Sequence, residues 1–134
     1  MKFVLSLFAA TALMVGVSCA EDSPESVPGV VTVSAEEASP MYDAGVPFVD
    51  VRSDSDYEAG RIPGAIHLEL KSNFSEEALL AVAAKDKPVV IYCNGHSCLR
   101  SSAASLQAVG WGFTEVKYFR DGFPAWDAAG YAVE

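Results

Sequence analysis

The 134-residue chain is poor in cysteine, in basic residues and in long apolar segments, and each shortage excludes a class of protein. Three cysteines are too few for the disulfide framework of a small secreted scaffold. Nine lysines and arginines stand against 18 acidic residues, which gives a net charge of −9 and no basic cluster to neutralise nucleic-acid phosphates. The cysteines and the two histidines lack metal-ligand spacing, so we expect neither a metal nor a cofactor.

The longest apolar segment, residues 3–17, is shorter than the ~20 residues that a membrane-spanning helix needs. It follows the basic Lys2 and precedes the small residues 18–20. This arrangement is typical of a secretory signal peptide. We therefore expect residues 1–20 to be a signal peptide and the protein to be exported, in a bacterium to the periplasm.

The cleavage site allows two interpretations. Ser18 and Ala20 suit a conventional cut after Ala20, which would give a soluble product and which we favour because Gly16 does not fit the alternative. Residues 17–19 also resemble the end of a bacterial lipoprotein signal, in which Cys19 would be lipidated and would attach the protein to a membrane. Gly16 stands where that pattern usually has a larger aliphatic residue.

The rest of the chain predicts a flexible linker at residues 21–29, rich in Pro, Ser and Glu, and one domain at residues 30–134. Strand and helix signals alternate in this domain. We expect strands at 31–33, 48–51, 65–68, 89–92 and 116–119, and helices near 35–42, 53–59, 75–84, 99–109 and 125–129. The segment 89–92 is apolar on both faces, which is typical of a central parallel strand. The pattern predicts an α/β fold of three layers, a central parallel sheet of about five strands with helices on both faces.

Cys93 lies at the expected carboxyl end of the strand 89–92, and the loop 94–98 leads from it into a helix. Ligands of open α/β sheets bind at the carboxyl ends of strands, and a loop that enters a helix gathers N–H groups that favour an anion. We therefore expect a lowered pKa for Cys93 and a nucleophile near neutral pH. Gly95 permits a positive φ, so the loop amides can converge. The alternative is a buried structural cysteine.

Four motifs, in the right order, resemble the rhodanese family and cover nearly all of the chain beyond the signal segment. Residues 50–52 (Asp-Val-Arg) are similar to its early Asp-x-Arg signature, and residues 58–66 to its Gly-(His/Arg)-Ile-Pro-Gly-Ala segment. Tyr92-Cys93, the loop and Arg100-Ser101 resemble the catalytic-cysteine region. Residues 119–126 are similar to the closing Gly-Gly-x-x-x-Trp signature. The resemblance implies the three-layer rhodanese-like fold.

The resemblance also implies sulfur transfer. The Cys93 thiolate would take the outer sulfur of a small sulfur-containing anion such as thiosulfate, become a persulfide, and pass the sulfur to cyanide or a thiol. A redox protein is a further candidate partner. The substrate-binding loop would be Asn94, Gly95, His96, Ser97, Cys98, Leu99 and Arg100, whose amides would stabilise the anion. Arg100 is a candidate for holding the donor, and His96 is expected to be solvent-exposed.

The sequence departs from the family pattern at two places. Six residues, 94–99, separate Cys93 from Arg100, where the family usually has fewer, and the loop resembles a subgroup with a Cys-Asn-Gly-x-x-Cys pattern. Asp121 replaces the first glycine of the closing pair, which we expect a turn to tolerate. Because loop length and charge govern which anion fits, the usual substrate of the family cannot be carried over.

Other residues of these motifs are expected to support the site without taking part in the reaction. Asp50, Arg52 and Arg61 are predicted to be ion-pair partners around it. Trp111 and Trp126 are predicted to pack in the core or over the site.

Cys98 leaves three functions open. If it is a bystander, the protein is a sulfurtransferase. If it is a resolving thiol, it attacks a Cys93 persulfide or sulfenic acid and closes a disulfide, which predicts a thiol–disulfide or thiol-based reductase. The third function is a non-catalytic binding module, against which the retained Cys93 argues. A phosphatase or arsenate reductase of related fold is less favoured, because Leu99 stands where its loop arginine would be.

Overall fold

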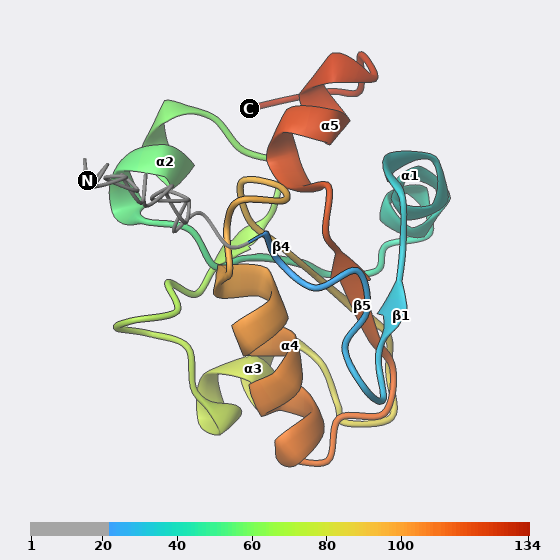
Figure 1. Cartoon of the computed structure of the whole chain (residues 1–134), viewed down its shortest axis with the longest axis vertical. Helices are drawn as coiled ribbons and strands as arrows, with labels where there is room; N and C mark the ends of the chain where they lie inside the picture. The colour runs from blue at the N-terminus through green and yellow to red at the C-terminus, as the bar shows by residue number, and fades with distance from the viewer. Residues whose placement is uncertain (1–21) are drawn as a thin grey trace, which may run out of the picture.

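The computed structural model describes residues 22–134 and shows one parallel sheet between two layers of helices (Figure 1). The strands are β1 (Val31–Thr32), β2 (Phe48–Asp50), β3 (Ile66–His67), β4 (Val89–Tyr92) and β5 (Val116–Phe119). The helices are α1 (Ala35–Asp43), α2 (Asp54–Ala59), α3 (Glu76–Val82), α4 (Arg100–Gly110) and α5 (Gly122–Ala128). The predicted three-layer α/β fold is confirmed, and each expected strand and helix is present. The largest difference is that α5 begins at Gly122 instead of residue 125.

The strand order β1-β5-β4-β2-β3 places β4 in the middle of the sheet. Each of its four residues is buried, as the run of apolar side chains predicts. All neighbouring strands pair in parallel, so their carboxyl ends meet at one edge of the sheet. Arg52 follows β2 at this edge, Cys93 follows β4 and Arg120 follows β5. This edge therefore positions the candidate site.

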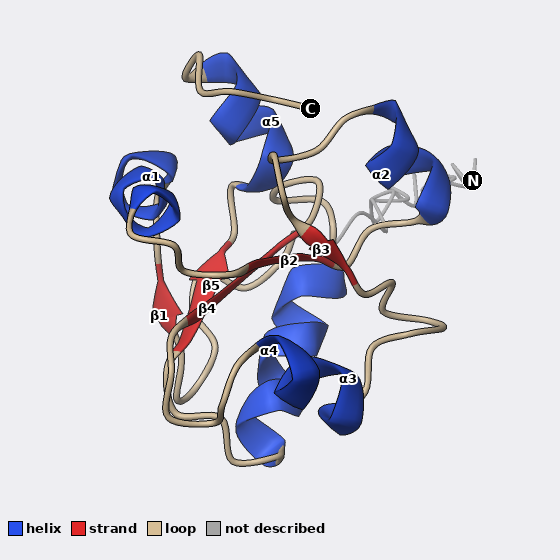
Figure 2. Ribbon diagram, turned by 180° about the vertical axis from the view of Figure 1, so that it is seen from behind, coloured by secondary structure: helices blue, strands red, loops and turns tan. Residues whose placement is uncertain are grey.

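The two faces of the sheet bury different side chains. Figure 2 shows α3 and α4 on one face and α1, α2 and α5 on the other. The α3–α4 face is mainly aliphatic, with Leu79 and Ile91 fully buried. The opposite face is aromatic, and Trp126 lies there in edge contact with Phe48 and Phe119. Trp126 is therefore a core residue, as predicted.

Serine side chains cap three of the helices, but α4 begins without a side-chain cap. Ser34 and Glu37 form a capping box at the start of α1. Ser53 and Ser75 accept a backbone N–H of α2 and α3 in the same way. The N-cap of α4 is Leu99, which has no polar side chain. The first amides of α4 are therefore free to bind another group, and this end of the helix faces the loop that follows β4.

The segment before β1, expected to be a flexible linker, is anchored to the domain at Ser23 and Val27, while the other residues of 22–29 are exposed. Ser23 is buried, and its N–H donates to the His96 carbonyl at 2.6 Å while its carbonyl accepts from Arg120 at 2.7 Å. Val27 is only 5% exposed. The predicted signal peptide lies outside the described residues. Between residues 22 and 134, no helix is long and apolar enough to cross a membrane.

Candidate active site

Cys93 lies directly after the central strand β4, and its side chain is fully buried at the start of α4. The thiol donates to the Ser101 hydroxyl oxygen at 3.1 Å and to the Cys98 carbonyl at 3.5 Å. The Ser101 backbone N–H in turn donates to Cys93 Sγ at 3.4 Å. The uncapped N-terminus of α4 thus provides an amide and a hydroxyl to this sulfur. Sequence reasoning placed Cys93 here, but it did not identify Ser101 as its partner.

The loop between Cys93 and α4 turns back on itself at Gly95. Gly95 has a φ of 101°, the left-handed region predicted for this position. The Cys98 N–H donates to the Gly95 carbonyl at 3.0 Å and closes the turn. This turn brings Cys98 beside Cys93, and both cysteines are free thiols. Ser97 and Leu99 are exposed on the outer side of the loop.

The two thiols differ in acidity, and the difference is opposite to our expectation. A hydrogen bond with the Cys93 thiol lowers the pKa of Cys98 to about 6, and the backbone amides of Asn94 and Arg100 contribute to this decrease. The same hydrogen bond with Cys98, together with burial, raises the pKa of Cys93. The predicted lowering of the Cys93 pKa is therefore wrong. The loop amides and the helix N-terminus stabilise a thiolate at Cys98, which is partly exposed, while Cys93 retains its proton.

A buried network fixes the first residue of the loop. Asp50 accepts hydrogen bonds from Arg52 Nη2 at 2.7 Å and from the Tyr92 hydroxyl at 2.8 Å. Arg52 Nη1 donates to Asn94 Oδ1 at 3.1 Å, and Asn94 Nδ2 donates to Asp56 at 2.8 Å. Asp50 and Arg52 are 0% and 3% exposed, so the predicted ion pair is confirmed as a buried one. Arg52 thus binds the oxygen of the Asn94 side-chain amide, and Asp56 binds its nitrogen.

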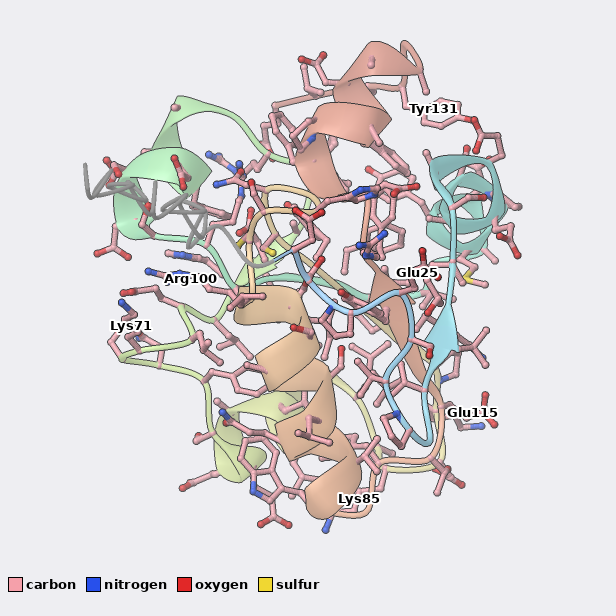
Figure 3. The ribbon with its side chains drawn as sticks, in the orientation of Figure 1. Glu25, Lys71, Lys85, Arg100, Glu115 and Tyr131 are labelled. Carbon is pink, nitrogen blue, oxygen red and sulfur yellow. The ribbon has the colours of Figure 1, made fainter. Side chains whose placement is uncertain are left out.

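Arg100 and His96, at the loop, each contact an acidic side chain. Arg100, which Figure 3 labels at the start of α4, pairs with Glu69 at 3.1 Å and donates to the Val51 carbonyl at 3.3 Å. His96 contacts Asp121 at 2.5 Å and is 52% exposed, as expected for a loop histidine. Arg100 is therefore close to the site, but its charge is balanced by Glu69. No sequence motif indicated Glu69.

The closing motif supports the site through its second glycine. Gly122 has a φ of 68°, and a Cβ atom there would lie 2.2 Å from the Cys93 carbonyl oxygen. The same carbonyl accepts the Phe123 N–H at 2.9 Å. Asp121 has ordinary right-handed backbone angles, φ −66° and ψ −25°, so this position does not require glycine. The turn tolerates Asp121, as predicted, whereas Gly122 is required for the close approach to Cys93.

The remaining predicted residues have structural contacts. Arg61 pairs with Glu134 at 3.4 Å, close to the C-terminus. Trp111 packs on Phe74, with ring centroids 5.4 Å apart, beside the α3–α4 core. Between residues 22 and 134, no three His, Cys, Asp or Glu side chains are grouped closely enough to hold a metal ion.

Comparison with known proteins identifies the family. The family model described as "Rhodanese-like domain" matches residues 34–129. A protein named thiosulfate sulfurtransferase GlpE, from Pseudomonas savastanoi, is 34% identical over 96 residues, which cover 72% of this chain and 86% of the relative. The crystal structure of the BH2092 protein from Bacillus halodurans is similar, with 25% identity and a TM-score of 0.68 over 78% of this chain and 76% of that one. A human single-domain sulfurtransferase, TSTD1, shares the fold with 23% identity and a TM-score of 0.62, over 72% of this chain and 95% of that chain. The chain therefore belongs to the family of rhodanese-like domains.

Proposed function

We propose that the protein is a sulfurtransferase that carries sulfane sulfur as a persulfide on Cys93 and passes it to a thiophilic acceptor. The observation that carries this proposal is the position of Cys93, whose sulfur accepts the Ser101 amide at the N-terminus of α4. Membership of the family supports sulfur transfer in general. The relative named thiosulfate sulfurtransferase supports thiosulfate, or a related sulfane-sulfur anion, as the donor.

The two thiols together provide the nucleophile. Near neutral pH the negative charge of the pair is favoured on Cys98, while Cys93 retains its proton. When a donor enters, Cys93 gives this proton to Cys98 and attacks the outer sulfur of the donor. With thiosulfate, the sulfur–sulfur bond breaks and its electron pair leaves with sulfite. The Ser101 N–H and hydroxyl lie beside Cys93 Sγ and stabilise the thiolate that forms when the proton leaves.

The direct test is Cys93→Ser in the full domain. We expect this variant to lose both the mass gain of one sulfur atom after treatment with thiosulfate and the formation of thiocyanate with cyanide as acceptor. Circular dichroism of the variant checks that the fold is retained. Unchanged sulfur labelling in a folded Cys93→Ser variant would sink the proposal.

We also propose export of the protein, on the sequence of residues 1–20 alone. In its native host, the mature chain is expected to begin at Glu21 and to be found outside the cytoplasm. Mass spectrometry of the purified N-terminus tests this. A diacylglycerol group on Cys19 would replace the soluble form with the lipoprotein alternative, and a chain that retains residues 1–20 would contradict export.

A further inference from the structure

Cys98 faces the proposed sulfur carrier in the folded state. The turn closed by the Cys98 N–H and the Gly95 carbonyl, 3.0 Å apart, sets Cys98 beside Cys93. Cys93 Sγ lies 3.5 Å from the Cys98 carbonyl oxygen, so the two residues are in contact. No helix has to unfold to bring the thiols together. A sulfur atom bound to Cys93 would therefore form next to a second thiol of the same chain.

The surroundings favour reaction within the chain over reaction with an external acceptor. Cys93 is fully buried, so an acceptor from solvent must enter the loop to reach its sulfur. Cys98 is already in contact, and an intramolecular nucleophile has a high effective concentration. The amides of Asn94 and Arg100 are directed at Cys98 and stabilise its thiolate. These contacts give Cys98 a chemical role that a small bystander residue would not need.

We propose that Cys98 resolves the Cys93 persulfide, so that the protein releases the transferred sulfur as hydrosulfide and is left with a Cys93–Cys98 disulfide. This inference rests on the proposed persulfide at Cys93. It adds a second activity, the two-electron reduction of sulfane sulfur, to the transfer step.

The resolving step balances in atoms and electrons. After the first step, Cys93 carries a persulfide anion and Cys98 holds the proton taken from Cys93. Cys98 Sγ attacks Cys93 Sγ, and the persulfide sulfur–sulfur bond breaks with its electron pair on the outer sulfur. That sulfur takes the Cys98 proton and leaves as HS⁻. The two cysteines are oxidised and the sulfane sulfur is reduced.

A second turnover needs a reductant for the disulfide. A dithiol attacks one sulfur of the Cys93–Cys98 bridge, forms a mixed disulfide and then closes its own disulfide, which restores both thiols. With thiosulfate as donor, the sum is thiosulfate plus dithiol giving sulfite, hydrogen sulfide and an oxidised dithiol. The partner that this chemistry requires is a dithiol, either a small molecule or a redox protein.

The test compares wild type, Cys98→Ser and Cys93→Ser after one equivalent of thiosulfate, without reductant. In wild type we expect free sulfide in proportion to the protein, and a Cys93–Cys98 disulfide seen as the loss of two hydrogens in the loop peptide. Cys98→Ser loses the group that takes the Cys93 proton, so we expect slower sulfur uptake. The sulfur that is taken up should remain on Cys93, without sulfide release, until cyanide removes it as thiocyanate. Cys98→Ala serves as a second variant in case the serine disturbs the loop.

The possible results separate the two proposals. A stable sulfur adduct on Cys93 in wild type, with neither sulfide nor the disulfide, overturns the resolving role and leaves the sulfurtransferase intact. If folded wild type gives no sulfur adduct, no sulfide and no disulfide, the persulfide at Cys93 fails, and the resolving step fails with it. Addition of dithiothreitol to wild type and thiosulfate is expected to make sulfide release catalytic, and single-turnover release in its presence would contradict the proposed cycle.

Discussion

The loop between β4 and α4 has two ends with opposite properties. Its strand end, Cys93 and Asn94, is tied to the sheet: Cys93 is buried, and Asn94 is held by Arg52 and Asp56. Its helix end, residues 98–100, is partly exposed and is where the thiolate resides. The sulfur nearest the core is therefore fixed in position but protonated, and the more accessible sulfur has the charge.

This contrast separates two requirements of a nucleophilic cysteine. Burial fixes the position of Cys93 but disfavours its charged form. The backbone amides of Asn94 and Arg100, one from each end of the loop, favour the charged form of Cys98. Because Cys93 contacts Cys98, a proton can pass between the two ends. Variants can weaken either end separately, and the following predictions are arranged from the largest expected effect to the smallest.

The strand end should be most sensitive to Asp50→Asn. The substitution leaves the buried Arg52 without its counter-charge, and loss of one member of a buried ion pair costs about 3–5 kcal/mol. Urea denaturation measures the change in the free energy of unfolding. Glu115→Gln is the matched control, because it makes the same change in the exposed Lys117–Glu115 pair, where about 0–1 kcal/mol is expected. Equal effects of the two variants would show that the network does not hold the strand end.

Gly122→Ala should disturb the strand end of the loop through the closing motif, residues 119–126. The added Cβ would meet the Cys93 carbonyl, 2.2 Å away, and would sit at a φ of 68°. The clash and the backbone strain together are expected to lower the free energy of unfolding by about 2–4 kcal/mol and to displace Cys93. Gly130→Ala is the control, because Gly130 has a φ of 80° but no atom within 4 Å of an added Cβ. In Gly130→Ala, backbone strain alone should lower the free energy of unfolding by about 1 kcal/mol. If Gly130→Ala is as unstable as Gly122→Ala, contact with the Cys93 carbonyl does not explain the instability of Gly122→Ala.

The sequence predicted the strand end of the loop better than the helix end. Strand 89–92 and its cysteine follow from a local run of apolar residues, and periodicity reports such runs directly. The acidity of Cys98 depends on where a turn at Gly95 directs two amides, and a sequence pattern does not contain this geometry. Glu69 was missed for a similar reason: it lies 31 positions before Arg100, and only the fold brings them together.

The packing of residues 22–29 was also missed, for a compositional reason. Pro, Ser and Glu are typical of linkers, and the segment has few apolar residues to signal burial. Apart from the buried Val27, its attachment is polar: Arg120 donates to the Ser23 carbonyl, and the Tyr118 hydroxyl donates to the Pro24 carbonyl at 3.0 Å. Backbone carbonyls can accept from a domain whatever their side chains are. Composition alone therefore does not distinguish a free linker from one held by its backbone.

The helix end can be tested by the pH dependence of alkylation. Iodoacetamide reacts with the thiolate, so modification of Cys98 should rise through a midpoint at about pH 6 and fall as the pH drops below it. Cys93→Ala removes the hydrogen bond that lowers this pKa, so its midpoint should move to higher pH. At a fixed pH below the midpoints of wild type and Cys93→Ala, Cys98 should be alkylated more slowly in the variant. The expected difference is about tenfold for each pH unit that separates the two midpoints. Cys93→Ser keeps a hydroxyl donor, so its alkylation midpoint is expected to lie between those of wild type and Cys93→Ala. A wild-type midpoint at the ordinary cysteine value of about 8.5 would contradict the shared proton.

The smallest expected effect concerns the charge that a donor meets at the helix end. Glu69 balances Arg100, so a dianion such as thiosulfate gains little from that arginine. Glu69→Gln removes the negative charge and should lower the KM for thiosulfate roughly two- to fivefold, with little change in kcat, because the arginine contributes to binding and not to the sulfur transfer itself.

Glu36→Gln is the control for Glu69→Gln, since it changes the net charge equally but lies on α1, on the opposite face of the sheet from α4. The difference between the two variants should shrink as ionic strength rises, because salt screens the attraction of a partly exposed arginine. An equal decrease in KM for both variants would mean that overall charge, and not Arg100, governs the donor. The two ends of the loop would then share the sulfur chemistry between them, and recognition of the donor would lie outside both.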